Sequence, residues 1–365
     1  MEPGIGAGIS TPTPGSIPRV EREMQTMKRR GHLPERPAQA LAGRIIRCIL
    51  FDFGDTLWFR GDARTWERLE MSANQRAAAI LREQVAPAFL PGLDNLILGQ
   101  RLREAFNEQV RAVIQSSPGL EAHGPQVVLQ TLRAWGIHVP NEAVGEAIFE
   151  ALRVRIPESR PLFQDTHATL ETLQQRGFAL GVASNRLWGG RPFHEDVQSL
   201  GLFKYFDPRA VAISADLGVR KPNPAIFLHA LNALRIPPHE AVMVGDSLRA
   251  DIAGALSLGM VAVWKPKRIL YSRVKAHIQA LSYTSTAAQA LDSAPPEPGT
   301  QMGGAVVGIV NGAPPGMHIT DDDYMLAQLK SRDSLDQFFS GEIKPDLVIE
   351  HLSELLDVFQ EVGKQ

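Results

Sequence analysis

With 365 residues the chain exceeds a typical single domain, and its 44% hydrophobic content supports a sizeable core with an inserted or appended unit. A net charge of −2 gives no indication of nucleic-acid binding, and no run approaches the roughly 18 apolar residues of a membrane helix. One cysteine excludes an intrachain disulfide, and the N-terminus lacks the apolar segment of a signal peptide, so we expect a cytoplasmic location.

Residues 1–43 differ in character from the rest of the chain. The stretch 1–18 is rich in Gly, Pro, Ser and Thr, which predicts a disordered tail. The small basic cluster at 28–30 is more simply explained as solvated charge than as a targeting signal.

The first predicted strand is an apolar run, residues 45–51, that stops at Asp52 and continues as Phe53-Gly54-Asp55-Thr56. A short stretch of β-branched and aromatic residues ending at an acid and a glycine is typical of a buried strand entering a loop. Ligands of open α/β sheets bind outside the carboxyl ends of the strands. A carboxylate there is well placed as a nucleophile or a metal ligand.

Residues 60–155 are helical by pattern. Apolar residues recur at helical spacing within 66–85, 93–114 and 127–135, and a further helix is predicted over 141–152. Three arginines near the start of this segment are more simply surface charges than ligands of a substrate anion: Arg60, Arg64 and Arg68.

Two more apolar strands end in polar groups, and a lysine lies between them in the chain. The run 178–183 leads into Ser184-Asn185, and the run 241–244 leads into Gly245-Asp246, with Asp251 shortly after. Lys221 stands just before a proline-flanked helical pattern.

In this order, the segments resemble the motifs of the haloacid dehalogenase-like (HAD) hydrolase superfamily: Asp52 with Thr56, Ser184, Lys221, and Gly245-Asp246 with Asp251. The resemblance implies an α/β fold, a doubly wound (Rossmann-like) parallel sheet with an inserted α-helical cap domain. We place the core at 44–59, 156–265 and 342–362, the cap at 60–155, and an insertion of unknown role at 266–341.

By this resemblance Asp52 is both the nucleophile and a ligand of Mg²⁺, a hard cation that favours oxygen ligands. The other implied ligands are the Gly54 carbonyl and Asp246, with Asp251 supporting the site directly or through water. The implied activity is hydrolysis of phosphate monoesters of a small metabolite through an aspartyl-phosphate on Asp52. No nucleic-acid or membrane partner is implied.

The resemblance also implies a set of phosphate-binding groups. Lys221 would screen the crowded negative charges and hold the phosphate, and Thr56, Ser184 and Asn185 would bind its oxygens. Phosphoryl transfer consists mostly of such positioning and charge neutralisation.

One departure concerns the general acid. The family's first motif usually carries a second Asp two residues after the nucleophile, where this chain has Gly54 and then Asp55. Three alternatives follow: Asp55 reaches the leaving group through an altered loop, the enzyme favours good leaving groups, or the protein is a weakly active or inactive phosphometabolite-binding or interaction protein. Dehalogenases of the superfamily also lack this acid and need no metal, but Asp246 and Asp251 near a nucleophilic Asp favour a bound cation instead.

The C-terminal part carries a strand and helix that resemble the end of this fold, at 345–349 and 351–356. They follow the strand 261–264 only after the insertion 266–341, which contains a Pro-rich stretch and a small-residue run. We hypothesise that this insertion covers an edge of the core or mediates self-association into a homo-oligomer.

Overall fold

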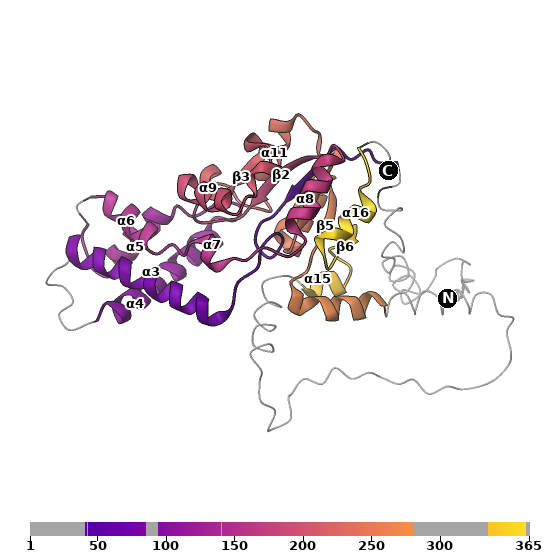
Figure 1. The fold of residues 1–365 in the computed structure, drawn as a ribbon. Helices are drawn as coiled ribbons and strands as arrows, with labels where there is room; N and C mark the ends of the chain where they lie inside the picture. Colours follow the sequence, from indigo (N-terminus) through magenta and orange to yellow (C-terminus); the bar gives the residue numbers. More distant parts are fainter. Residues whose placement is uncertain (1–40, 42, 85–93, 140, 280–334, 363–365) are drawn as a thin grey trace, which may run out of the picture.

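A computed structural model describes residues 41, 43–84, 94–139, 141–279 and 335–362. Nearly all of the predicted N-terminal tail lies outside these residues. The centre of the described part is a six-stranded parallel sheet in the order β3-β2-β1-β4-β5-β6, with helices on both faces (Figure 1). Its strands are β1 Cys48–Phe51, β2 Ala179–Ser184, β3 Val211–Ile213, β4 Ala241–Gly245, β5 Val261–Trp264 and β6 Leu347–Val348.

The strand order puts β1 at the centre of the sheet. Phe51 is in register with Val182 of β2 on one side and with Val244 of β4 on the other. The chain runs outward through β2 and β3 and then returns to β4 beyond β1. This reversal is the topological switch point where doubly wound folds bind ligands. The predicted fold class is confirmed.

Alternation along the strands sends side chains to two separate apolar layers. One layer contains Phe51 and Val182, and the other contains Leu50 and Met243. The first layer packs against α8 Thr166–Gln175, α9 Gly190–Ser199 and α16 Leu355–Val358. The second packs against α11 Pro224–Leu234, the π-helical turn η4 Leu248–Ala253 and the ends of the insertion. The shorter helices are α10 Ser214–Leu217, α12 Gly254–Ser257, η1 Phe203–Tyr205, η2 Pro208–Ala210, η3 Pro238–Glu240 and η5 Leu352–Glu354.

Cys48, the chain's only cysteine, lies fully buried in β1, and burial raises the pKa of its thiol to about 12. The thiolate is the reactive form, so we expect Cys48 to be inert in the folded protein. An aromatic disulfide reagent should label no thiol in native protein and one thiol per chain in urea. Rapid labelling of the native protein would contradict the buried position.

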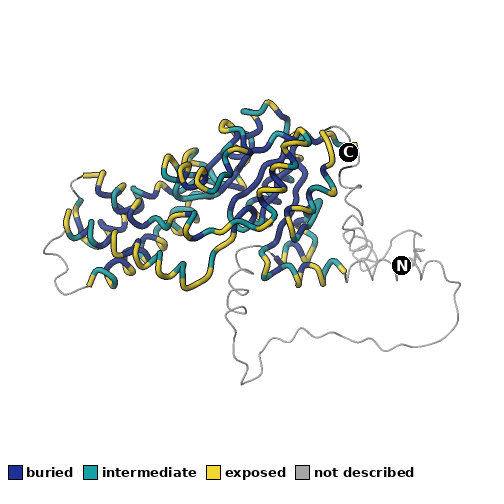
Figure 2. The backbone as a smooth tube through the Cα atoms, in the orientation of Figure 1, coloured by how far each residue is buried: buried dark blue, intermediate teal, exposed yellow. Residues whose placement is uncertain are grey.

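The helical part before β2 has an apolar core of its own, which contains Leu81, Leu102 and Ile148. The bounds of its helices are α3 Ala63–Gln84, α4 Asn95–Ser116, α5 Gly124–Ala134 and α6 Ala143–Ala151. The short helix α7 Ile156–Ser159 follows, and its Ile156 packs in the first apolar layer of the sheet. A Cβ at Gly99 of α4 would lie only 2.1 Å from the Asn74 carbonyl oxygen, so α3 and α4 touch backbone to backbone. Figure 2 shows the two buried regions, one in the sheet and one among these helices.

The described ends of the predicted insertion pack on the core. Residues 268–279 are helical and bury Leu270 and Val274, and α15 Leu335–Phe339 buries Phe338, whose ring centroid lies 4.8 Å from that of Trp264. The predicted last strand forms β6, parallel to β5. The Pro-rich and small-residue stretches lie outside the described residues, and self-association stays a prediction. Within the described part, no helix has the length and apolarity needed to cross a membrane.

Candidate active site

The predicted acids meet at the carboxyl edge of the sheet. Asp52 directly follows β1, and Asp246 directly follows its neighbour β4. The backbone N–H of Asp52 donates to the carbonyl of Val244 at 2.9 Å, which extends the pairing of the two strands up to the acids. Ser184 is the last residue of β2, on the other side of β1. Neighbouring parallel strands thus deliver these side chains to one place, as the sequence predicts.

Lys221 is the cation at the centre of this cluster. Its Nζ lies 2.7 Å from Asp52 Oδ1 and 2.6 Å from Asp251 Oδ1, and it donates to the carbonyl of Ala183 at 2.6 Å. The lysine is 3% exposed. Burial alone would lower its pKa, but Asp251 and Asp52 outweigh burial and raise that pKa above its usual value. Lys221 is therefore charged across the physiological pH range.

Asn185 holds the backbone of Lys221. Its Oδ1 accepts from the Lys221 N–H at 2.7 Å, and its Nδ2 donates to the Lys221 carbonyl at 3.0 Å. Only one of the two N–H groups of Asn185 Nδ2 is used in these bonds, so the phosphate-binding role of Asn185 stays a prediction. The sequence suggested phosphate binding because Asn185 follows the end of a strand, β2. A residue at that position can equally well fix the backbone of Lys221. What the structure shows is that Asn185 fixes the backbone of Lys221.

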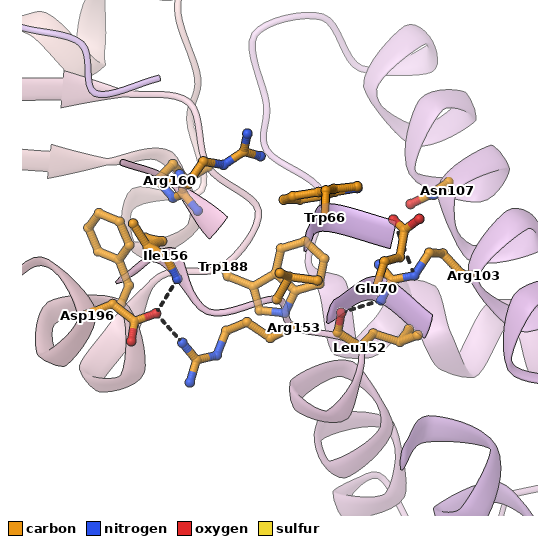
Figure 3. A pocket seen from close by; sticks show the side chains of 13 residues that line it. Trp66, Glu70, Arg103, Asn107, Leu152, Arg153, Ile156, Arg160, Trp188 and Asp196 are labelled. Carbon is orange, nitrogen blue, oxygen red and sulfur yellow. Dashed lines mark hydrogen bonds and ion pairs between the residues drawn. The ribbon is translucent and has the colours of Figure 1, made fainter. Parts of the chain in front are cut away.

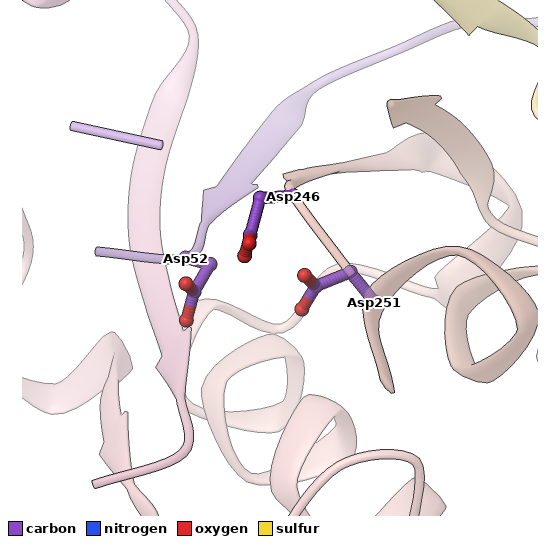
Figure 4. Close-up of side chains that lie close together, drawn as sticks. All are labelled: Asp52, Asp246 and Asp251. Carbon is purple, nitrogen blue, oxygen red and sulfur yellow. The ribbon is translucent and has the colours of Figure 1, made fainter. Parts of the chain in front are cut away.

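Asp52, Asp246 and Asp251 form a group of carboxylates that can share one ion (Figure 4). One oxygen from each lies within 4.8 Å of the others. Burial, together with the other carboxylates, raises the pKa of Asp246 well above its usual value, although Lys267 opposes the shift. Burial also raises the pKa of Asp251, to about 6. Two buried acids and one half-buried acid with oxygen donors this close fit a hard divalent cation, since a cation relieves both the desolvation and the repulsion.

Local packing fixes Asp251 and Asp246. A Cβ on Gly245 would lie 2.3 Å from Asp251 Cγ, so only glycine leaves room for this carboxylate. The Ser247 N–H donates to Asp251 Oδ2 at 2.9 Å, and the Trp264 indole N–H donates to the Asp246 carbonyl at 2.8 Å. The Gly-Asp pair of the sequence therefore has a steric reason as well as a chemical one.

The loop after Asp52 shows where the missing acid would lie. A Cβ at Gly54 would be 3.8 Å from Asp52 Oδ2, an ordinary contact distance. Asp55 has φ of 53°, in the left-handed region, and its carboxylate lies 3.9 Å from Lys267 Nζ, which is 3.4 Å from Asp246 Oδ2. Asp55 thus lies beside the acid cluster on the Lys267 side.

The Thr56 hydroxyl is buried without a hydrogen-bond partner among the described residues, and the phosphate-binding roles of Thr56 and Ser184 stay predictions.

Two arginines near this site were not found from the sequence. Arg186 follows the Ser184-Asn185 pair and lies against Trp58, with its guanidinium carbon 5.6 Å from the ring centroid. Arg160 lies over Trp66, 4.5 Å from the ring centroid. The position of Arg186 next to the serine motif was an available signal, whereas nothing in the local pattern marks Arg160. The arginines considered from the sequence, Arg60, Arg64 and Arg68, are exposed.

Comparison with known proteins identifies the family to which the chain belongs. A family model described as haloacid dehalogenase-like hydrolase matches residues 46–259. A glyceraldehyde 3-phosphate phosphatase of Methanopyrus kandleri is 29% identical over 60% of this chain and 83% of its own length. A phosphoserine phosphatase of Thermus thermophilus is 36% identical over 41% of this chain and 59% of its own length. The crystal structure of a HAD phosphatase from Thermococcus onnurineus is 25% identical over 61% of this chain and 87% of its own, with a TM-score of 0.42. Since the family model spans more than half of the sequence, including the strands and the lysine that build the site, this chain belongs to the haloacid dehalogenase-like hydrolases.

Proposed function

We propose that the chain is a divalent-metal-dependent phosphatase that acts on a small phosphorylated metabolite, with Asp52 as nucleophile. The observation that carries the proposal is the position of Lys221 Nζ between Asp52 and Asp251, with Asp246 close enough to share a cation with both. A nucleophilic carboxylate, a fixed cation and a set of oxygen ligands at one strand edge are what phosphoryl transfer through an aspartyl-phosphate needs.

The chain's own residues would divide the work as follows. Lys221 holds Asp52 Oδ1, so Oδ2 is assigned as the oxygen that attacks phosphorus. The new bond forms between this oxygen and phosphorus, while the bond from phosphorus to the ester oxygen breaks and the alkoxide leaves, taking a proton from water or from Asp55. Water then attacks the phosphorus of the aspartyl-phosphate, the bond from phosphorus to Asp52 breaks, and inorganic phosphate and the Asp52 carboxylate are released together with a proton. Asp52, Asp246, Asp251 and the Gly54 carbonyl would hold Mg²⁺, which neutralises charge on the transferring oxygens when bound.

The helices between 60 and 155 are proposed as a cap over this site. Their contact with the core includes the Trp188 indole, which stacks on Phe149 at 4.8 Å between ring centroids and donates to the Phe149 carbonyl at 3.1 Å. Trp188 comes from the loop that follows Ser184, so the serine motif and the helical part are linked directly. Such caps exclude water and select the substrate.

One observation favours a second candidate, a weakly active phosphometabolite-binding protein. Gly54 cannot donate a proton to a leaving alkoxide, and general acid catalysis contributes about 10²–10⁴-fold. The two candidates differ in turnover with an activated ester, which needs no proton on the leaving group.

Removal of metal should therefore lower the hydrolysis of 4-nitrophenyl phosphate by about 10²- to 10³-fold, since metal ions supply several kcal/mol of transition-state stabilisation. The measurement is steady-state turnover after dialysis against EDTA, and added Mg²⁺ should restore it. Equal thermal melting of both samples would control for unfolding. Equal rates with and without metal would refute metal dependence, and no turnover with Mg²⁺ would favour the binding protein.

A further inference from the structure

A cavity of about 280 Å³ lies where the helical part meets the core (Figure 3). It is lined from both sides, by Trp66 and Glu70 of α3 and by Phe193 and Asp196 of α9, among others. Its lining carries four arginines but only two acids. The side chains that line this partly enclosed space therefore carry more positive than negative charge.

Two of the four arginines, Arg103 and Arg153, have ion-pair partners. Arg153 Nη1 lies 2.7 Å from Asp196 Oδ2, and Arg103 donates to Asn74 and, at 2.6 Å, to the carbonyl of Leu152. Both acids are used by these contacts: Asp196 by Arg153 together with Arg155, and Glu70 by Arg103 at 3.8 Å. The acids of the cavity leave no counter-charge for the remaining two arginines.

Those two are Arg160 and Arg186. Within the described part of the chain, neither guanidinium has an ion pair or a side-chain hydrogen bond, and Arg186 Nε is buried without an acceptor. Each is held in place by aromatic rings instead: Arg160 by Trp66, and Arg186 by Phe193 at 5.0 Å. Burial, followed by the charge of Arg160, lowers the pKa of Arg186 to about 10. The positive charges of Arg160 and Arg186 repel each other, and their guanidinium N–H groups lack acceptors among the residues that the structure describes. A bound anion would offset both costs.

Both arginines are also close to the reacting loop. Arg186 contacts Trp58, which forms a β-bridge with Gly54, and its charge interacts with that of Asp52. Arg160 interacts with the charge of Asp55. None of the carboxylates of the acid cluster lines the cavity, whereas Arg186 both lines it and contacts Trp58 of the loop after Asp52. An anion in the cavity would therefore be a group of the substrate other than the transferred phosphoryl group.

We propose that Arg160 and Arg186 bind a second anionic group of the substrate, a carboxylate or a second phosphate, in the cavity between helical part and core. The guanidinium fork matches the geometry of either anion. The inference rests on the proposed phosphatase function and narrows its substrates to phosphate esters with a negative charge at the far end.

The test compares three matched two-carbon esters: ethylene glycol monophosphate, which has no second anion, phosphoglycolate, and ethylene glycol bisphosphate. Their binding is measured by calorimetry with full-length Asp52→Asn protein, which needs no turnover, and kcat/KM is measured with wild type. We expect about 10- to 100-fold preference for at least one of the doubly anionic esters, beyond the statistical advantage of two equivalent phosphates. Which ester is preferred identifies the second anion. Arg160→Gln and Arg186→Gln should each remove most of the preference, and Arg111→Gln, at an exposed position of α4, should retain it.

Equal binding of all three esters would overturn the inference. So would arginine variants that weaken all three equally, because the arginines would then hold the transferred phosphoryl group. If wild type turns over none of the esters, the phosphatase proposal fails on its own, and the binding ratios still decide whether the cavity takes a second anion.

Discussion

Asp52→Asn should reduce metal-dependent phosphate ester hydrolysis to background, since loss of a catalytic nucleophile costs on the order of 10⁶-fold in kcat. The amide keeps the shape of the side chain but has no charged oxygen to attack phosphorus. Lys221 would keep Asp251 as its partner at 2.6 Å, so the local structure should survive. The measurement is kcat with 4-nitrophenyl phosphate, together with the mass of acid-quenched protein, in which wild type should carry one added phosphoryl group and the variant none.

The matched control is Asp357→Asn, which makes the same chemical change on an exposed residue of α16 and should leave kcat unaltered. Thermal melting of both variants would show that each is folded. An Asp52→Asn protein that keeps metal-dependent turnover would exclude Asp52 as nucleophile. If digestion of the acid-quenched wild-type protein gave a phosphorylated peptide that does not contain Asp52, Asp52 would likewise be excluded, and the nucleophile would be another residue.

The parts of this site that follow strand ends were predictable from sequence. Asp52 and Asp246 each end a short apolar run, and parallel strands bring their carboxyl ends to one edge, so their proximity follows from the fold class alone. Lys221 required the family resemblance, because a lysine before a proline is by itself a common surface feature. Its buried position between Asp52 and Asp251 is a tertiary fact that no periodicity expresses.

The contacts that the sequence did not reveal have one physical cause. Asn185, Arg160 and Arg186 owe their roles to what other segments place beside them, not to their local pattern. Asn185 meets the Lys221 backbone only because β2 and the lysine loop adjoin, and Arg160 borders the cavity only because α3 supplies Trp66 as its wall. Sequence periodicity located α3 and α4 to within a few residues but gave no information on which of their side chains line the cavity.

Gly54→Asp should raise kcat/KM for alkyl phosphates by about 10²–10⁴-fold, the usual contribution of a general acid, because leaving alkoxides need a proton. A Cβ at this position lies 3.8 Å from Asp52 Oδ2, and Gly54 does not have a positive φ, so a side chain fits without backbone strain. The measurement compares ethylene glycol monophosphate with 4-nitrophenyl phosphate. The gain should be confined to the alkyl ester, because nitrophenolate leaves without protonation.

Gly54→Asn is the matched control, because it adds the same bulk without an acid and should give no gain with either ester.

Asp55→Asn tests whether Asp55 serves as the general acid of the wild-type enzyme. Asp55 lies toward Lys267 and adopts a left-handed conformation, so we expect its removal to affect alkyl ester hydrolysis far less than a general acid should. If Asp55→Asn instead abolishes alkyl ester turnover while sparing the nitrophenyl ester, Asp55 is the displaced acid. In that case Gly54→Asp should add little, because the proton would already have a donor and the reversed order of acid and glycine would be a functional variant of the motif.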